Sequence, residues 1–586
     1  MPNTRWIEDN KPSVKFPLWT RANIGEVLPE PPSPLGWDLV WETGTLLGWR
    51  DCGVNRLGTP PEEVSEIRPE VSGLFGGYGY LNASAFRVFG ERAPGMTAQE
   101  IDEAYFGDHP DVPPFVPEDW HVSPSATEGI VQWMTWVMTT PDQPELEADR
   151  VAAEACRADR PDLTEMSNTE LLDLSHALTP TVRTMFEQHI NQSAAAPIGS
   201  GVIGAVAAAV GDPSLTLKII GGLGDVDSAA PSFVMWDMSR TVRASVGLVA
   251  VFDEGPRGLT AKLRKIEASD DPSFGEVNTD VVGFMAQLQS FIERFGSRGP
   301  NEWDIHAHTW ETDPDLILAA IDRMRLAPDE DAPSKRLSVR EAERKTVVAG
   351  VAEAIAGDPE AHGQFLAAVH SASLFLPGRE RSKTSIIKVI HEIRMAAWEL
   401  GARLVAKGGC DEARDICLLF ADEIERGLDD PEWAAATVSD RKEHLDHLQQ
   451  LEPPFLFEGE MPPIETWARR ADLTAEAALS GEVIQAVAGS SGVYRGTARV
   501  VLDPSDPTVL GPGEILVAPH TDPAWTPLFV AAGAVVVDVG AALSHAVIVS
   551  RELGLPCVVS ATSATKRIAD GTEIEVNGDL GTVTLV

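Results

Sequence analysis

The sequence predicts a multidomain protein, in which a large and mostly α-helical body precedes a small C-terminal α/β domain. The chain has 586 residues, and because one hydrophobic core stops growing at about 250–300 residues, several cores are expected. Between residues 145 and 480, apolar side chains recur with helical spacing. After Gly481 the pattern changes to short β-branched runs, which predicts strands.

The helical body is assigned to residues 1–480. Its first 125 residues are rich in proline, glycine and tryptophan, which indicates irregular structure with short helices. The most apolar window, 194–210, is interrupted by proline and glycine, so it predicts a loop followed by a buried helix rather than a membrane span. Further amphipathic or alanine-rich helices are expected at residues 340–356, 381–407, 411–427 and 464–480.

Charge and cysteine usage indicate the compartment and exclude some partners. The chain has 47 basic and 89 acidic residues, a net charge of −42, whereas nucleic acids and membrane surfaces attract basic patches. We therefore expect no nucleic-acid and no membrane partner. The five cysteines form no Cys-x-x-Cys pair, and the first residues lack the pattern of a signal peptide, so a cytoplasmic location is expected.

The C-terminal domain is assigned to residues 492–586. The small residues Ala-Gly-Ser-Ser-Gly precede it, and their composition predicts a flexible hinge linker at 481–491. A small domain on a hinge can carry a chemical group between two separate sites. Its strands are expected at residues 498–502, 514–518, 534–539, 557–559 and 573–576.

One histidine of this domain lies where a strand is expected to end and a helix to begin. Gly540 breaks the apolar run before it, Ser544 is a natural N-cap, and His545 then occupies the first helical turn. The positive end of the helix dipole disfavours imidazolium and favours an anion attached to the ring. His545 is therefore a candidate nucleophile toward phosphorus. The alternative is a histidine that merely caps the helix.

The residues around His545 resemble the phosphohistidine swivelling domain of the phosphoenolpyruvate-utilising enzymes, which include rifampicin phosphotransferases and phenylphosphate synthases. This resemblance implies that His545 carries the phosphoryl group and that residues 492–586 are the swivelling domain. The sequence departs from the family at Ala541, where a second glycine is usual. The segments that carry the resemblance are 492–498 (GVYRGTA), 521–527 (TDPAWTP), 540–556 (GAALSHAVIVSRELGLP) and 570–583.

A second cluster lies in the helical body, at Arg379-Glu380-Arg381-Ser382-Lys383. Arg379 and Lys383 are four residues apart, so they share a face if the helix starts early enough, and two cations on one face can clamp a phosphoryl group. The alternative is a solvated basic face that pairs with acidic residues. The segment also resembles the Arg-Glu-x-x-Lys motif of rifampicin phosphotransferases. That resemblance implies that residues 1–480 bind the acceptor and that Arg379 and Lys383 face the phosphohistidine.

Two more segments resemble parts of the same acceptor domain. Residues 20–29, from Thr20 to Pro29, resemble its opening, although by composition they are only a polar turn that leads into a proline-rich loop. Residues 295–305 contain Arg298 and Glu302, which could line the substrate site. The alternative for these two is an internal salt bridge.

The family resemblance also implies a reaction and its partners. The acceptor-like region begins within the first few dozen residues, no Gly-x-x-x-x-Gly-Lys loop follows, and the body lacks the strand–helix alternation of a TIM barrel. We therefore expect one subunit of a dikinase-type phosphotransferase, with ATP and Mg2+ bound by a separate ATP-grasp subunit. We expect no directly bound cofactor or metal here, since His306 and His308 have no second ligand cluster.

The expected acceptor is a hydroxyl of a small, phenol-like aromatic molecule, by resemblance to the phenylphosphate synthases. One alternative is a component of a rifamycin-type antibiotic phosphotransferase. Another is a non-catalytic phosphohistidine module with a regulatory role. Phosphoenolpyruvate as the phosphoryl donor in place of ATP also stays open.

Overall fold

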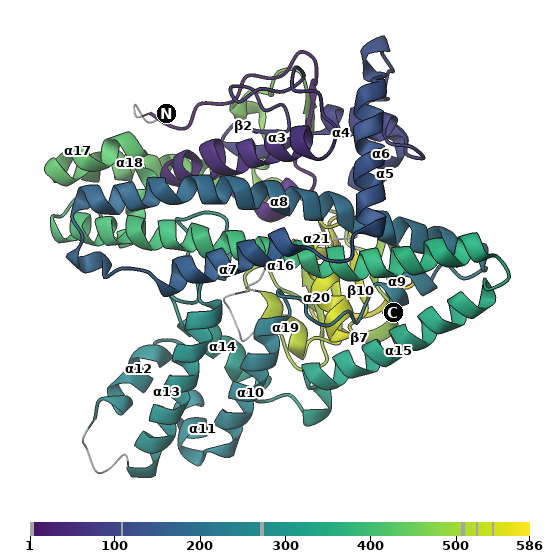
Figure 1. The fold of residues 1–586 in the computed structure, drawn as a ribbon. Helices are drawn as coiled ribbons and strands as arrows, with labels where there is room; N and C mark the ends of the chain where they lie inside the picture. Colours follow the sequence, from purple (N-terminus) through teal and green to yellow (C-terminus); the bar gives the residue numbers. More distant parts are fainter. Residues whose placement is uncertain are drawn as a thin grey trace. The chain divides into compact units, whose positions relative to one another are not determined.

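The computed structural model describes residues 5–106, 109, 111–269, 275–504, 510–522, 525–541 and 544–586. The chain forms two compact units. Unit 1 comprises Met1–Gly199, Trp303–Ala307 and His370–Thr474, and unit 2 comprises Ser200–Glu302, His308–Val369 and Ala475–Val586. The predicted fold class, a helical body with a small C-terminal α/β domain, is confirmed (Figure 1).

Two long helices form the framework of unit 1, and the chain passes between the units within each of them. They are α8 (Asn168–Ala209) and α16 (Pro359–Ala406), which run side by side in Figure 1. Their apolar faces enclose a core with the helices around them. The other helices of unit 1 are α1 (Ile24–Val27), α2 (Pro34–Gly36), the π-helix η1 (Trp37–Thr45), α3 (Leu46–Asn55), α4 (Ala83–Arg92), α5 (Ala98–Phe106), α6 (Pro124–Thr139), α7 (Pro144–Ala158), α17 (Ile424–Asp429) and α18 (Pro431–Gln449).

Helix α8 differs from the predicted loop and short helix at 194–210, because the helix runs through this window without a break. Pro197 lies inside it and can donate no hydrogen bond. Ala195, Ala196 and Ile203 are fully buried, so packing offsets that loss. By length and composition α8 is the one described helix that could cross a membrane, and 33% of its most apolar window is buried inside the protein. The core helix of a soluble protein can have the same length and apolar composition, so this is weak evidence for a membrane span.

Three other helix predictions were wrong in extent. Residues 411–427 form the 3-10 segments η6 (Ala413–Leu418) and η7 (Ala421–Glu423) and only the start of α17. Helix α16 begins at Pro359 rather than near residue 381, so it continues through Pro377. Residues 464–480 form only the short 3-10 turns η8 (Ile464–Thr466) and η9 (Arg470–Asp472) instead of a helix. Tertiary contacts override their alanine-rich pattern, since Trp467 is buried against the ring of Tyr78, 6.0 Å between centroids.

A four-stranded antiparallel sheet in unit 1 joins distant parts of the chain. Its strands lie in the order β2-β3-β1-β4, and β1 pairs with β3 on one side and with β4 on the other. The chain leaves β1 directly for helix α1, so the sheet fixes where that helix starts. The strands are β1 (Leu18–Thr20), β2 (Ser72–Phe75), β3 (Tyr78–Asn82) and β4 (Leu456–Glu458).

Unit 2 contains an eight-stranded sheet in the order β5-β12-β11-β7-β8-β9-β10-β6. Strands β7 to β10 are parallel and the strands outside them are antiparallel. Because both faces are covered, alternate residues of β9 enter different cores: Val536 faces one and Val535 and Val537 face the other. The strands are β5 (Val483–Gln485), β6 (Val487–Ser490), β7 (Val493–Val500), β8 (Ile515–Ala518), β9 (Ala534–Val537), β10 (Cys557–Val559), β11 (Glu573–Asn577) and β12 (Thr582–Leu585).

The structure differs from the predicted hinge linker at 481–491. This stretch forms β5, which pairs with β12, and β6, which pairs with β10. Its small residues do not mark flexibility here, because they allow close backbone packing: a Cβ atom added to Gly489 would lie 2.8 Å from Val547 Cγ2. The remaining domain boundaries stay a prediction.

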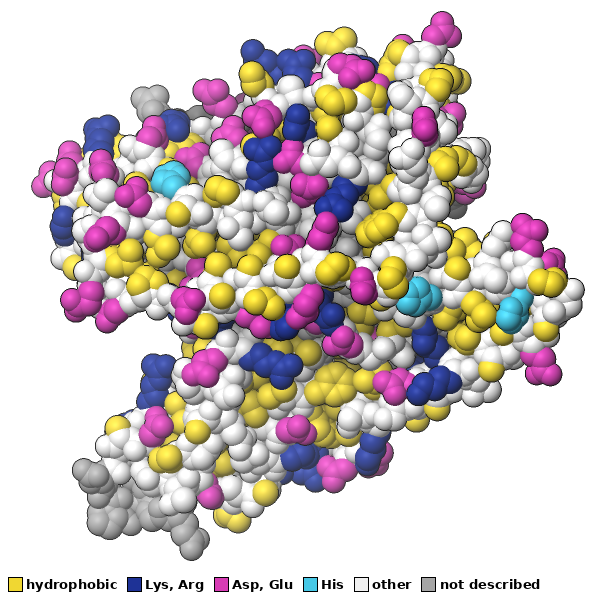
Figure 2. Space-filling view, viewed as in Figure 1, with side chains coloured by type: hydrophobic (Ala, Val, Ile, Leu, Met, Phe, Trp, Pro, Cys, Tyr) yellow, Lys and Arg dark blue, Asp and Glu magenta, His cyan; other side chains and the backbone are white. Residues whose placement is uncertain are grey.

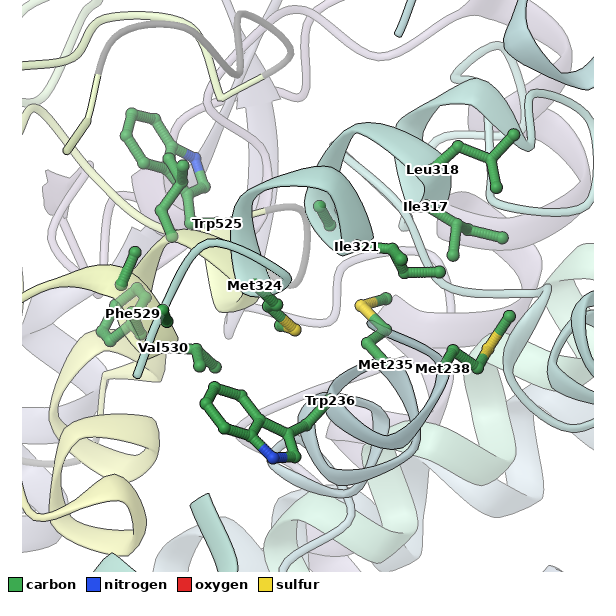
Figure 3. Close-up of a cluster of buried hydrophobic side chains, with 14 of the residues drawn as sticks. Met235, Trp236, Met238, Ile317, Leu318, Ile321, Met324, Trp525, Phe529 and Val530 are labelled. Carbon is green, nitrogen blue, oxygen red and sulfur yellow. The ribbon is translucent and has the colours of Figure 1, made fainter. Parts of the chain in front are cut away.

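Helices α10 to α14, α19 and α20 pack on one face of the sheet through a shared apolar core, and Ala564 of α21 lies in the core on the other face. Figure 3 shows Met235 and Met238 of α10 facing α14, with Phe529 and Val530 of α19 close to Trp236. The helices are α9 (Leu215–Ile219), α10 (Ala230–Ala244), α11 (Val246–Phe252), α12 (Leu259–Glu267), α13 (Gly275–Phe295), α14 (Asp315–Met324), α15 (Pro333–Ala354), α19 (Thr526–Ala531), α20 (His545–Leu553) and α21 (Ala564–Arg567).

Helix α20 is buried along its whole length, including two charged residues at its end. The guanidinium of Arg551 donates a hydrogen bond to the carbonyl of Gly489 at 2.8 Å. The carboxylate of Glu552 accepts hydrogen bonds from the N–H groups of Leu223 (3.1 Å) and Gly224 (3.0 Å). Burial nevertheless raises the pKa of Glu552 to about 7. These contacts fix the helix that begins at His545.

On the face in view in Figure 2, the acidic side chains do not gather into one patch. Figure 2 shows Asp and Glu side chains scattered among Lys and Arg over the face in view. Many of them form ion pairs, such as Arg499 with Glu514 at 2.5 Å in unit 2. The net charge of −42 therefore acts as a diffuse repulsion that favours solubility over binding of one basic ligand.

We predict that Gly578→Ala destabilises the sheet of unit 2 by about 1–3 kcal/mol. A Cβ atom there would lie 1.9 Å from the Ser490 carbonyl oxygen, which belongs to β6 and cannot move aside alone. Thermal unfolding of the full chain measures the effect. Gly350→Ala is the matched control, because that exposed site on α15 has no atom within 4 Å and alanine there should stabilise slightly. Equal melting temperatures for both variants would contradict the packing of β6.

We predict that Glu552→Gln removes part of the pH dependence of stability. A carboxyl whose pKa rises from 4.5 to about 7 on folding binds more protons when folded, so the free energy of unfolding falls as pH rises through that window. The drop is on the order of 3 kcal/mol. Denaturant unfolding between pH 4.5 and pH 8 measures it, and Glu353→Gln at an exposed position of α15 controls for loss of a charge. Identical pH slopes in wild type and Glu552→Gln would show that the carboxyl is not buried.

Candidate functional site

His545 is the first residue of α20 and is 8% exposed. The predicted change from strand to helix is confirmed, since β9 ends at Val537 and Ser544 occupies the N-cap position. The Ser544 hydroxyl does not cap the helix, and among the described residues it has no hydrogen-bond partner. Ala542 and Leu543 of the quoted motif lie outside the described residues.

Two threonine hydroxyls hold the imidazole of His545. Nδ1 lies 3.2 Å from Thr521 Oγ1, and Nε2 lies 3.1 Å from Thr526 Oγ1. A neutral imidazole has one donor and one acceptor nitrogen, and a hydroxyl can serve either, so both nitrogens are satisfied in either tautomer. Phe529 packs edge-on against the ring, 5.9 Å between centroids. The ring is therefore held in one orientation, with an apolar wall on one side.

Sequence reasoning assigned no role to Thr521 and Thr526, although both lie in a segment that carried the family resemblance. The sequence could have indicated them, because two hydroxyl residues stand five positions apart in this segment. Pro523 and Ala524 between them lie outside the described residues. If a phosphoryl group occupied one ring nitrogen, the hydroxyl there would become free to donate to its oxygens.

Arg298 and Glu302 form the internal salt bridge that was the alternative for them. Arg298 Nε lies 2.7 Å from Glu302 Oε2, and both side chains are at most 3% exposed. The Asn301 N–H donates to the carboxylate of Asp522 at 3.1 Å, next to Thr521. This segment of unit 2 is thus tied to the loop that holds His545. The pair braces that loop, and a direct role in binding substrate stays a prediction.

Arg379 and Lys383 lie on α16 in unit 1, one helical turn apart and both half-buried. They share a face, as their spacing predicted, although in the interior of a helix instead of at its start. The guanidinium of Arg379 donates a hydrogen bond to the buried carboxylate of Glu380. Ser382, between the two cations, donates to the Arg379 carbonyl at 2.8 Å.

Two titratable side chains that sequence reasoning missed respond to these cations. Burial and the charges of Arg379 and Lys383 hold the pKa of His189 well below its ordinary value, and His189 Nδ1 lies 3.0 Å from the Ser382 hydroxyl. Burial raises the pKa of Glu26 to about 7, and the same two charges oppose that rise. Both residues therefore belong to the electrostatic surroundings of the Arg-Glu-x-x-Lys segment.

Buried amides lie beside the same segment. A Cβ atom on Gly378 would be 2.5 Å from Gln192 Oε1 and 3.1 Å from Gln143 Oε1. Among the described residues, the side-chain amides of Gln143 and Gln192 have no hydrogen-bond partner. Buried polar atoms are normally paired, so these amides can take up polar groups of a bound molecule. No group of three or more metal-ligating side chains occurs in the described part of the chain.

Unit 1 thus holds Arg379 and Lys383 with a set of ionisable and amide groups, whereas unit 2 holds His545 with the loop that Arg298 and Glu302 brace. Each set is complete within its own unit. The first set can bind and polarise a polar acceptor, and the second set can carry an anion on a ring nitrogen.

Comparison with family models gives two matches. Residues 188–380 match the rifampicin phosphotransferase fourth domain, and residues 510–581 match the mobile domain of PEP-utilising enzymes. The first match contains Arg298, Glu302 and Arg379, and the second contains His545.

Proteins with similar sequences also include rifampicin phosphotransferases. A rifampicin phosphotransferase from a Streptomyces species is 30% identical over 51% of this chain and 34% of its own length. The Bacillus cereus rifampicin phosphotransferase is 29% identical over 50% of this chain and 33% of its own length. The prodigiosin synthesizing transferase PigC of Serratia marcescens is 28% identical over 59% of this chain and 38% of its own length. The chain spans between 8% and 39% of the lengths of the relatives it matches.

The matched ranges include the segments 295–305, 521–527 and 540–556 on which the sequence resemblance depended, whereas 20–29, 492–498 and Lys383 lie outside them. The resemblance to the phosphoenolpyruvate-utilising enzymes is thereby confirmed, and these comparisons support a phosphotransferase of that family.

Proposed function

We propose that the protein transfers a phosphoryl group by way of a phosphohistidine on His545 to a hydroxyl group of a small acceptor bound in unit 1. The observation that carries the proposal is the setting of His545 at the start of α20, with a hydroxyl at each ring nitrogen. A neutral, oriented imidazole is a nucleophile, and the helix N-terminus favours the anion it would carry.

Arg379 and Lys383 stabilise the transferred group in this proposal. Phosphoryl transfer is catalysed mostly by neutralising and positioning the charge on the moving group. A guanidinium can bind two phosphoryl oxygens at once, and an ammonium adds a point charge. Their common face on α16 supports the assignment, as does the matched family model that ends at residue 380.

We further propose that ATP, with Mg2+, is handled by a separate ATP-grasp subunit that charges His545. Neither of the two matched models is a nucleotide-binding domain by its description. The acceptor in this proposal is an aromatic, phenol-like hydroxyl compound, and the complex works in the cytoplasm. Arg298 and Glu302 remain proposed substrate-site residues through the loop that they brace.

A second candidate is a component of a rifamycin-type antibiotic phosphotransferase. The specific observation in its favour is the match of residues 188–380 to the fourth domain of rifampicin phosphotransferase. The partnerless amides of Gln143 and Gln192 suit an acceptor with several polar groups better than a bare phenol. Growth of cells that express the chain with its partner, with and without rifampicin, separates the two candidates.

We predict that intact-mass spectrometry at alkaline pH detects one added phosphoryl group on the chain after incubation with ATP, Mg2+ and a candidate ATP-grasp partner. His545→Asn should abolish it completely, since no other nitrogen would be charged. His520→Asn is the matched control in the same domain and should retain it. An added phosphoryl mass that persists in His545→Asn would contradict the assignment of His545 as the carrier.

We predict that Arg379→Ala and Lys383→Ala each slow discharge of phospho-His545 to the acceptor by about 10²–10³-fold, while charging is unchanged. Both cations act on the transferred group and neither contacts the donor side. Arg381→Ala is the control, because residue 381 lies on the opposite side of α16. The rate is read as loss of the phosphoryl mass over time. Equal discharge rates in wild type and the three variants would mean that Arg379 and Lys383 only form a solvated basic face.

A further inference from the structure

The transfer proposed above needs a base, because a hydroxyl must lose its proton as it bonds to phosphorus. Unit 1 offers a carboxylate near the two cations. Glu26 lies on the single-turn helix α1, is half-buried, and has Arg379 and Lys383 as the charges that act on it. Among the described residues, its carboxylate has no hydrogen-bond or ion-pair partner. It therefore stands available to a bound molecule.

The backbone around Glu26 is held in an unusual conformation. Asn23, the N-cap of α1, has φ of 66° and ψ of −55°, which a non-glycine residue rarely adopts. Such strain persists only where neighbouring contacts enforce it, and it concentrates at functional sites. The buried guanidinium of Arg21 ties the chain after α1 to strand β3. Arg21 donates hydrogen bonds to the carbonyls of Gly79 (2.7 Å), Leu28 (2.9 Å) and Pro29 (3.3 Å).

The charge state of Glu26 suits a base at neutral pH. Burial raises its pKa to about 7, so the carboxylate is well populated at pH 7 and above while its affinity for a proton is far greater than that of an exposed carboxylate. The charged groups that act on it are Arg379 and Lys383 of α16. The same two cations act on His189 of α8, and the Arg21 guanidinium lies beside Gly25, the residue before Glu26. Without the two cations, the pKa would lie higher still.

The other candidate bases nearby are less suitable. His189 is fully buried, its Nδ1 is engaged by Ser382, and two neighbouring cations oppose formation of imidazolium. Glu380 is buried and paired with Arg379. Glu30 accepts a hydrogen bond from the guanidinium of Arg470 at 2.8 Å. Glu26 alone among these four combines partial exposure with a carboxylate that has no partner in the described structure.

We propose that Glu26 is the general base that takes the proton of the acceptor hydroxyl during phosphoryl transfer. This inference rests on the proposed function. The hydroxyl oxygen bonds to phosphorus as its proton moves to the Glu26 carboxylate. The N–P bond of phospho-His545 breaks, and its electron pair returns to the ring nitrogen, which takes a proton from solvent. Glu26 then releases its proton to solvent, so one proton passes overall from hydroxyl to imidazole.

The test charges the full chain directly with potassium phosphoramidate, which needs no partner protein, and subtracts the background of His545→Asn. Discharge is then followed by intact mass with two acceptors, phenol and 4-nitrophenol. Phenol keeps its proton at neutral pH, whereas 4-nitrophenol ionises near neutral pH and needs little help from a base. Wild type is compared with Glu26→Gln, Glu26→Asp and Glu30→Gln.

We expect Glu26→Gln to discharge to phenol about 10²–10⁴-fold more slowly than wild type, with the two proteins nearly equal for ionised 4-nitrophenol. Glu26→Asp should recover part of the phenol rate, and Glu30→Gln should match wild type. The wild-type rate with phenol should rise with pH through about 7, and this rise should vanish in Glu26→Gln.

Two outcomes would overturn the assignment: a wild-type rate for Glu26→Gln with phenol, or an equal loss with both acceptors, which would mean that Glu26 only supports the fold. The charging step separates this inference from the proposed function. Failure of His545 to accept any phosphoryl group would count against the carrier, whereas normal charging with altered phenol discharge concerns Glu26 alone.

Discussion

The pair of positive charges at Arg379 and Lys383 sets the chemistry of unit 1. Their spacing of one turn on α16 puts both on a partly buried face, where charge interactions are stronger than in water. The same pair keeps His189 neutral and limits the rise of the Glu26 pKa. Arg379 is also paired with the buried carboxylate of Glu380, so an incoming phosphoryl group would compete with that carboxylate for the guanidinium. Burial is the main cause of both pKa shifts, and the two cations lower the pKa of each neighbouring group.

His545 in unit 2 has a different setting, since a threonine hydroxyl lies at each of its ring nitrogens. Hydroxyls hold the ring, and the N-terminus of α20 supplies partial positive charge. A carrier that bound its phosphoryl group with full charges would release it slowly. In the proposed transfer, hydroxyl groups and a helix dipole would orient the phosphoryl group with weaker attraction than the cations of unit 1. That difference in charge would favour transfer from His545 toward the acceptor.

Local patterns were enough to predict His545, because strand, glycine break, N-cap and helix follow one another within a dozen residues. The spacing of Arg379 and Lys383 likewise predicted their common face. Glu26 could not be found in this way, since its burial depends on the folded chain and the two cations that act on it lie on α16, more than 300 residues away in the sequence. Residues 464–480 have a helical pattern but form short turns, because burial of Trp467 against Tyr78 outweighs propensity. Contacts between residues far apart in the sequence determine the local structure or the pKa at these positions.

The position of any hinge follows from the sheet of unit 2. A swivelling carrier needs a stretch of chain that can rotate without breaking strand pairs, and β5 and β6 exclude residues 483–490 from that role. The chain before β5 is also bound to the sheet, because the N–H of Ala478 donates to the Arg567 carbonyl and that of Gly481 to the Leu585 carbonyl. The stretch 473–477 has no regular secondary structure, and it spans the boundary between the units at Thr474. Rotation about this stretch would leave every strand pair of the sheet intact, but it would break the apolar core that the sheet shares with α10 and α14. A hinge and a swivelling carrier therefore stay predictions.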